Sequence, residues 1–281
     1  MKVTPVTLAL FIGVLAVPLH GLAATIGVNF VGGSSPGNVG SLGGGPVNAM
    51  ASAEVAGVVP QAFWNGAGIA NQSDTTVNRA GTLSALVDSG GAAVPFMQVE
   101  WASNNTFSTT LTDSAGNNRL MKGYLDSSGA LSPYTSSTSS VKVSSLPQSY
   151  AAGGFDLIVY FDGASTAGIQ DRIGQYQLFD GTSNTNTPLG EIFGRDVWGV
   201  DFSGTFIQAT GASAAAAGAG NYIRFTGLHT TSFTLLATGV AADVPRAPIN
   251  GFQIVAVPEP SALCAMLASC CVMLIRRRRG I

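Results

Sequence analysis

Charged residues and cysteines are scarce in this chain of 281 residues. Lys, Arg, Asp and Glu together make up 10% of it. All three cysteines, Cys264, Cys270 and Cys271, lie close to the C-terminus, so residues 24–256 cannot form disulfides, cysteine-ligated metal sites or a thiol nucleophile. The same segment carries two Lys and six Arg against fourteen Asp and Glu, a net charge of −6, which argues against nucleic acid as a partner.

Familiar catalytic motifs are also missing. Between residues 24 and 256 the chain has one histidine, His229, which lies in a predicted hairpin turn over residues 227–232. A Ser-His-Asp triad would have to be built on that turn. The chain has no His-Glu-x-x-His pair and no phosphate-binding loop. We therefore do not expect an enzyme of the serine, cysteine or zinc class.

The first 23 residues have the pattern of a secretory signal peptide. Lys2 supplies a positive start, residues 6–19 are mostly apolar, and Gly21 and Ala23 place small side chains where a signal peptidase reads them. We expect cleavage to leave a mature chain that begins near residue 24. The alternative is an uncleaved N-terminal anchor, but the apolar run is short for a membrane span.

The C-terminal tail combines three features. Val257, Pro258, Glu259 and Pro260 come first, residues 262–275 are apolar apart from Ser269, and Arg276, Arg277, Arg278 and Arg279 follow. A helix over residues 258–275 would be about 27 Å long, close to the ~30 Å hydrocarbon core of a bilayer. The four arginines would then stay on the cytoplasmic side. A core or amphipathic helix is the alternative, but the run has no polar face.

This three-part tail resembles the C-terminal sorting signal of PEP-CTERM proteins. The resemblance implies that an exosortase recognises Pro258, Glu259 and Pro260 at the membrane and cleaves nearby. It also implies a final location at the cell surface or in the extracellular matrix. The expected parts are a signal peptide over 1–23, an ectodomain over 24–256, and a sorting signal over 257–281 with a transmembrane helix over 262–275.

Alternating apolar and polar residues predict an all-β ectodomain. Ile26, Val28 and Phe30 alternate with Gly27 and Asn29, a period of two that is typical of strands with one buried face. Further strands are predicted over residues 97–101, 120–125, 141–146, 155–161, 175–179, 205–209, 222–226, 232–238 and 249–255. About ten strands joined by turns rich in Gly, Ser, Asn and Asp favour an antiparallel, jelly-roll-like β-sandwich.

A few segments favour other local structure. Residues 32–46 contain seven glycines and predict a long loop, residues 50–60 predict one short helix, and the glycine-flanked residues 214–217 predict a loop or turn. Turns are also marked by Asp162-Gly163, Asp180-Gly181 and Asn250-Gly251. The last pair falls inside a predicted strand, where it could form a bulge instead.

Four segments of the ectodomain are similar to the β-sandwich ectodomains of PEP-CTERM proteins. They are residues 27–30, 61–65, 156–163 and 246–254, and the last resembles the final strand of galactose-binding-like jelly rolls. This resemblance implies a glycan ligand held by loops at one end of the sandwich. A structural calcium ion is frequent in such domains.

The three tryptophans are the candidates for stacking on a sugar ring. Trp64 and Asn65 lie in a predicted loop, where an aromatic face beside an amide suits a polyol; Trp64 could equally plug the bottom of the sandwich. Trp101 shares the phase of Val99 and is assigned to the core. Trp198 lies in a polar neighbourhood, and both interpretations stay open for it.

Carboxylates decide whether the chain could hydrolyse a polysaccharide. Glycosidases use two Asp or Glu residues about 5 to 10 Å apart. The candidates are Glu100, Asp156, Asp162, Asp171, Glu191, Asp196 and Asp201, and their spacing in the sequence pairs none of them. We interpret Asp162 and Asp180, which precede glycine, as turn formers, and Glu100 and Asp156 as solvated residues on polar strand faces. A calcium ion would draw on this set and on backbone carbonyls.

The sequence therefore favours an exported protein of the cell envelope or extracellular matrix with a structural or adhesive role. Its expected partners are an exosortase, the membrane and exopolysaccharide, with Trp64, Asn65 and Trp198 as ligand-binding candidates. No catalytic cofactor is expected. The alternative is a secreted polysaccharide hydrolase that uses an Asp or Glu pair.

Overall fold

The computed structural model describes residues 25–32, 48–67, 80–103, 105–127, 138–164, 171–241 and 245–257. In these ranges strands in several sheets predominate and helices are few, which confirms the all-β prediction. The described ranges contain no helix that is long and apolar enough to cross a membrane. The predicted signal peptide, most of the glycine-rich loop, the transmembrane helix and the arginine cluster lie outside the described residues.

Two large sheets contain most of the strands. The five-stranded sheet has the order β14 (Tyr222–Leu228), β10 (Phe155–Tyr160), β16 (Gly251–Ala256), β1 (Thr25–Phe30) and β2 (Asn65–Ala67). The seven-stranded sheet has the order β13 (Gly218–Ala219), β12 (Gly190–Asp196), β11 (Arg172–Asp180), β15 (Phe233–Ala241), β9 (Thr138–Ser144), β6 (Gln98–Ala102) and β3 (Ala80–Leu83). Their paired strands are antiparallel, except that the short edge strands β2 and β13 pair in parallel with β1 and β12.

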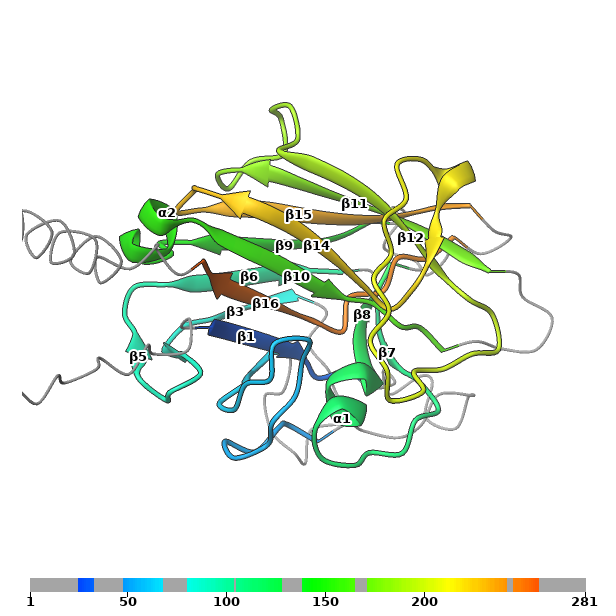
Figure 1. Ribbon diagram of the computed structural model, residues 1–281, viewed down its shortest axis with the longest axis horizontal. Coiled ribbons are helices and arrows are strands. Elements are labelled where there is room, and N and C mark those ends of the chain that lie inside the picture. The colour runs from blue at the N-terminus through cyan, green and yellow to red at the C-terminus, as the bar shows by residue number, and fades with distance from the viewer. Residues whose placement is uncertain are drawn as a thin grey trace, which may run out of the picture.

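Small elements complete the described fold. They are the strand pairs β4 (Leu86–Val87) with β5 (Ala93–Val94) and β7 (Asn105–Ser108) with β8 (Gly123–Asp126), the helices α1 (Asn117–Lys122) and α2 (Gln148–Gly153), and the 3₁₀ turn η2 (Ala214–Ala216). Figure 1 shows the five-stranded sheet in front of the seven-stranded one, with α2 at one end of the layers and α1 towards the other.

The two sheets share one hydrophobic core. Rings from opposite sheets meet at Phe155 and Phe233, whose centroids are 6.1 Å apart, and at Phe161 and Tyr176, 5.3 Å apart. Strand β9 buries every second residue against this core, as the period of two predicts. The middle strands of the five-stranded sheet are buried on both faces, because a second apolar cluster covers their other side.

The second cluster, which we call the outer cluster, lies on the face of the five-stranded sheet turned away from the shared core. Ile158 and Tyr160 of β10 point into it, whereas Leu157 and Val159 point into the shared core. The outer cluster also contains Met50, Trp64, Leu120, Met121 and Phe202. Several segments that are distant in the sequence therefore form a second hydrophobic layer on the five-stranded sheet.

Most of the predicted strands are present, and three local predictions were wrong. Residues 120–125 were predicted as one strand, but α1 ends at Lys122 and β8 begins at Gly123. Residues 205–209 form only an isolated bridge from Gln208 to Tyr222, because Phe206 packs against Tyr160 with ring centroids 5.2 Å apart. Residues 50–60 contain turns and a bridge instead of a helix. Residues 214–217 form the predicted turn.

The first and last strands of the described chain pair with each other. In the register of β1 and β16, Thr25 lies opposite Val255, and the Val257 amide donates a hydrogen bond to the Gly154 carbonyl at 2.9 Å. Both ends of the domain therefore lie at the same end of the sheets, beside α2 (Figure 1). We call this the terminal end, and the opposite end, where β10 and β12 finish and β14 and β16 begin, the distal end.

Candidate functional site

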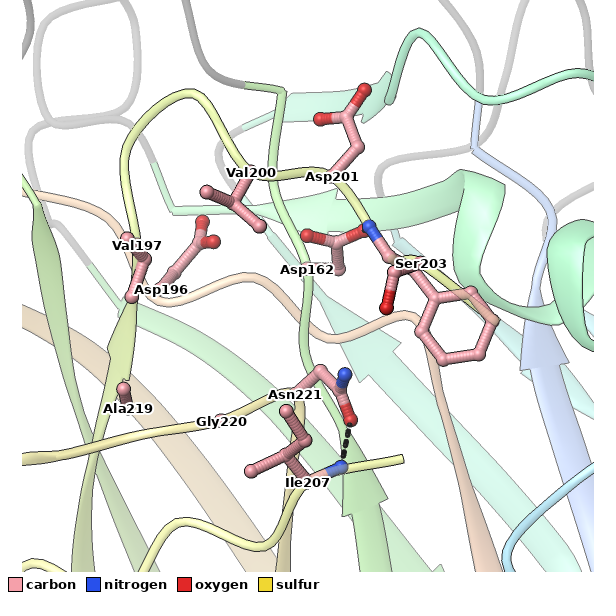
Figure 2. A pocket seen from close by; sticks show the side chains of 11 residues that line it. Asp162, Asp196, Val197, Val200, Asp201, Ser203, Ile207, Ala219, Gly220 and Asn221 are labelled. Carbon is pink, nitrogen blue, oxygen red and sulfur yellow. Dashed lines mark hydrogen bonds between the residues drawn. The ribbon is translucent and has the colours of Figure 1, made fainter. Parts of the chain in front are cut away.

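A small acidic pocket lies at the distal end. The chain leaves β10 after Tyr160 and β12 after Asp196, and the carboxyl groups of Asp162 and Asp196 reach the same cavity of about 140 Å³. Its remaining wall comes from residues 197, 200–203, 207 and 219–221, with Val200 and Ile207 as apolar members. Figure 2 shows the Asp162 and Asp196 side chains facing the space below Val200. Carboxyl groups from two different sheets therefore share one site.

Asp162 was predicted to be a turn former, but residues 161–164 form no turn in the structure. Its side chain is buried, with 3% of the residue exposed, and one carboxyl oxygen accepts a hydrogen bond from the Phe202 amide at 3.0 Å. The Asn250 side chain fixes the backbone here, because its oxygen accepts from the Asp162 amide at 2.6 Å and its nitrogen donates to the Asp162 carbonyl at 3.1 Å. These bonds fix the backbone at Asp162, and the carboxyl group of Asp162 is directed inward.

Asp196 is held beside a glycine. Its Oδ2 atom accepts a hydrogen bond from the Gly163 amide at 3.1 Å. A Cβ atom on Gly163 would lie only 3.1 Å from that oxygen and 3.1 Å from Nη1 of Arg172, so glycine permits this close approach. The Arg172 guanidinium is buried, and neither of its Nη atoms has a hydrogen-bond partner among the described residues.

The buried position changes the protonation of both carboxyl groups. Burial raises the pKa of Asp196 to about 7, although the Arg172 charge and the Gly163 amide act in the opposite direction. Burial also raises the pKa of Asp162, and the neighbouring Asp196 raises it further. Two carboxyl groups that share one buried site cannot easily both be charged. The pair therefore retains a proton near neutral pH and can act as both donor and acceptor.

Two further aspartates hold the wall of the pocket in place. Asp201 turns its side chain away from the other carboxyl groups (Figure 2) and accepts a hydrogen bond from Thr110. Asp171 accepts a hydrogen bond from the Trp198 amide at 2.9 Å and pairs with Arg195 at 3.5 Å. Within the described ranges, no group of three or more His, Cys, Asp or Glu side chains is arranged to hold a metal ion. The described residues therefore offer no such group for the expected calcium ion.

Trp64 and Asn65 do not form an open ligand site. Trp64 is 5% exposed, packs against Tyr160 in the outer cluster and donates its ring N–H to the Gln61 carbonyl at 3.1 Å. Asn65 lies in β2, and its side chain bonds the Gly27 carbonyl and both polar groups of the Val87 backbone. The packing alternative therefore holds for Trp64, and the amide of Asn65 is used to join strands.

The other two tryptophans differ from each other. Trp101 is buried and its ring meets that of Phe30 at 6.0 Å, which confirms its place in the core. Trp198 is 43% exposed, in the segment that forms the wall of the acidic pocket. Of the three tryptophans, only Trp198 is exposed.

The remaining candidates serve local structure. Asp156 was predicted to be solvated, but it is largely buried and accepts hydrogen bonds from the Arg224 guanidinium and the Gly227 amide. Asp180 ends β11 before a turn, as predicted, and accepts from Thr230. His229 donates its Nδ1 hydrogen to the Ala151 carbonyl at 2.9 Å. Glu100 and Glu191 are exposed.

The pairing of Asp162 with Asp196 could not be found in the sequence. Asp162 lies two residues after β10 and Asp196 is the last residue of β12, and only the packing of the two sheets brings these strand ends together. The available signal was weaker: each carboxylate lies at or just beyond the end of a strand with buried residues. Comparisons of the chain with protein-family models, with curated proteins and with solved structures found no match.

Proposed function

We propose that this protein is exported and sorted by an exosortase to the cell surface or extracellular matrix, where a jelly-roll-like β-sandwich has a structural or adhesive role. One observation carries the proposal: both ends of the domain lie at the terminal end, and the acidic pocket with Trp198 lies at the distal end. A domain tethered through its C-terminus would then turn its ligand-accessible loops away from the membrane.

Chain lengths support this orientation. Only residues 258–261 separate Val257 from the apolar run, and four extended residues reach at most about 14 Å. The six-residue strand β10 runs from the terminal to the distal end, a length of about 20 Å. Before cleavage, the terminal end would therefore lie close to the membrane, with the acidic pocket on the far side of the domain.

The position of the sorting motif fits processing by a membrane enzyme. Val257 is still hydrogen-bonded to the fold through Gly154, and Pro258, Glu259 and Pro260 follow at once. In this proposal the exosortase reads a short segment between a folded domain and a membrane helix. The folded domain is released or transferred intact, because none of its described strands extends past Ala256.

We assign the adhesive role to the distal end. Val200 and Ile207 are exposed and line the acidic pocket, and Trp198, which is also exposed, comes two residues before Val200 in the chain. A partly open aromatic ring next to polar groups suits a sugar, which has apolar faces and hydroxyl edges. Exopolysaccharide is the ligand class that this surface fits.

Trp198→Ala tests this assignment. We expect the variant to lose most of the binding of the processed protein to exopolysaccharide or a glycan array, because stacking on the indole ring is removed. Leu189→Ala is the matched control: Leu189 is similarly exposed, at 50%, but follows β11 at the terminal end, so binding should stay unchanged. Equal binding by both variants and the unaltered protein would exclude Trp198 from the site.

A second candidate function is polysaccharide hydrolysis. The observation that favours it is the buried pair Asp162 and Asp196, of which Asp196 has a pKa raised to about 7, as a general acid requires. Measuring the sugar released during the same incubation with polysaccharide separates the two functions. Soluble sugar released from the polysaccharide by the unaltered protein, and not by Asp196→Asn, would favour the hydrolase.

A further inference from the structure

Phe96 is the most exposed large apolar side chain among the described residues, and its backbone is strained. The residue is 87% exposed, and its φ is 67°, a left-handed conformation that bulky residues rarely adopt. It follows Pro95 in a turn between β5 and β6. A proline followed by a residue of positive φ is the pattern of a type II turn, whose third residue is normally Gly or Asn. Stability alone would therefore favour Gly or Asn at position 96.

The exposed surface next to Phe96 is apolar and uncharged. Ala92, Ala93 and Pro95 are exposed like Phe96, whereas Val94 is buried. We call residues 92–96 the apolar turn. Residues 89–99 contain no charged side chain. A strained aromatic residue that is held in solvent contributes little to the packing of the domain, and this points to a contact outside the fold.

The apolar turn lies at the terminal end. Gln98, two residues after Phe96, lies opposite Ser144 at the end of β9, and the chain then continues into α2. The hairpin of β4 and β5 is joined to the first strand, because the Ser89 amide donates a hydrogen bond to the Thr25 carbonyl at 2.8 Å. Figure 1 shows the connection from β5 to β6 along this end. Phe96 is therefore exposed at the end of the domain where the chain enters and leaves.

The C-terminal tail would hold this end near a bilayer. Val257 is bonded to the Gly154 carbonyl, and only residues 258–261 separate it from the apolar run. Four residues reach at most about 14 Å, and each headgroup layer of a bilayer is about 5 to 8 Å thick. The linker is therefore short enough to keep the terminal end at the membrane surface, and long enough for that end to rest on it.

We propose that the apolar turn docks on the bilayer that holds the C-terminal tail, with the Phe96 ring inserted at the boundary between headgroups and acyl chains. This inference rests on the membrane tether of the proposed function. Removal of the exposed ring from water favours the docked state. Because the apolar turn has no basic residue, docking does not require anionic lipid. The contact gives the domain a second attachment besides the tail, so the distal end is held facing outward.

Quenching by brominated lipids tests the docking, because bromine on an acyl chain quenches only those tryptophans that it approaches closely. The full chain is reconstituted in phosphatidylcholine vesicles with and without brominated acyl chains. We expect the fluorescence added by Phe96→Trp to lie at a shorter wavelength than that of a tryptophan in water, and to lose most of its intensity in the brominated vesicles. Trp is as bulky as Phe, so this variant keeps a large exposed ring.

Val240→Trp is the matched control, because Val240 is also exposed but lies near the end of β15 at the distal end. Its added fluorescence should be equal in both kinds of vesicle. The native tryptophans should respond little to bromine, since Trp64 and Trp101 are buried and Trp198 lies at the distal end. Equal quenching of the two variants would overturn the docking, because the domain would then have no fixed orientation on the membrane.

Flotation of the same vesicles separates this inference from the tether on which it rests. Protein that does not float with the vesicles has no tether, which overturns both proposals. Protein that floats, but whose Phe96→Trp fluorescence is not quenched, keeps the tether and overturns the docking alone. If that fluorescence is also shielded from dissolved iodide, a second copy or another protein covers the ring in place of lipid.

Phe96→Asn tests whether the ring serves the fold instead. Asn tolerates a positive φ, so this variant should unfold at a urea concentration no lower than that of the unaltered protein. A clear fall in the urea midpoint would show that the Phe96 ring packs within the domain, and would overturn the docking.

Discussion

At the scale of single residues, one buried amide organises the distal end. The Asn250 side chain is fully buried and donates to the carbonyls of Met121, Gly123 and Asp162. Its oxygen accepts from the Asp162 amide at 2.6 Å. One side chain thereby joins the start of β16, the junction of α1 with β8, and the backbone that carries Asp162. The sequence marked Asn250 only as part of a turn or bulge, because these partners are distant along the chain.

Asn250→Ala should strongly destabilise the protein. The truncation leaves several buried backbone groups without partners, and each such group costs about 1 to 3 kcal/mol, so we expect a loss of at least about 3 kcal/mol in the free energy of unfolding. Urea unfolding followed by tryptophan fluorescence measures it. The exposed Asn186 provides a control, with an expected change for Asn186→Ala within about 0.5 kcal/mol. A loss below about 1 kcal/mol for Asn250→Ala would contradict the role given to this residue.

The burial of Trp64 could not be predicted from the residues next to it in the sequence. An aromatic residue beside an amide in an apparent loop is equally compatible with a sugar platform and with packing. Its burial depends on the outer cluster, which is assembled from Tyr160, Met121 and Phe202, residues that no local pattern connects to position 64. Trp101 was predictable because its own strand fixes the phase of its side chain.

At the scale of elements, alternation predicted strands well where one face is buried and less well where apolar residues form the outer cluster. Residues 120–125 were predicted to form a strand, but Leu120 and Met121 reach the outer cluster from α1. Residues 205–209 are apolar for the same reason, since Phe206 packs on Tyr160. The sequence pattern indicates that a residue is buried, but tertiary contacts determine whether that residue lies in a strand, a helix or a loop.

Asp156 connects β10 to β14 at an irregular point. The register of these strands shifts between Phe155 and Leu157, and Gly227 of β14 has a positive φ of 66°. The Asp156 carboxylate spans this shift, because it accepts from the Gly227 amide at 2.9 Å and from Arg224 at 2.5 and 3.0 Å. A residue predicted to be merely solvated therefore stabilises a strand pair.

Asp156→Ala should lower the free energy of unfolding by about 2 kcal/mol, since it leaves the Gly227 amide and the Arg224 guanidinium without their acceptor. Thermal or urea unfolding measures the change. Glu100→Ala is the control, because Glu100 is exposed on β6 opposite Lys142 and exposed pairs contribute less than about 1 kcal/mol. Equal effects of the two substitutions would show that Asp156 has no special role in the strand pair.

At the scale of the whole molecule, the fold has two unlike ends. The chain enters and leaves at the terminal end, where Thr25 lies opposite Val255 and Val257 bonds to Gly154. The distal end holds the acidic pocket and the partly exposed Trp198. The described strands begin at Thr25 and finish at Ala256, so the segments that we propose as export and sorting signals lie outside these strands.

The mass of the protein recovered from the cell envelope tests the central claim most directly. For the unaltered chain we predict a species that lacks residues 1–23 and the apolar run over 262–275, and for Glu259→Ala a membrane-bound species that keeps the run, because the exosortase no longer recognises its motif. Recovery of the intact chain of 281 residues from the cytoplasm, or the same processed mass for both proteins, would contradict the proposal.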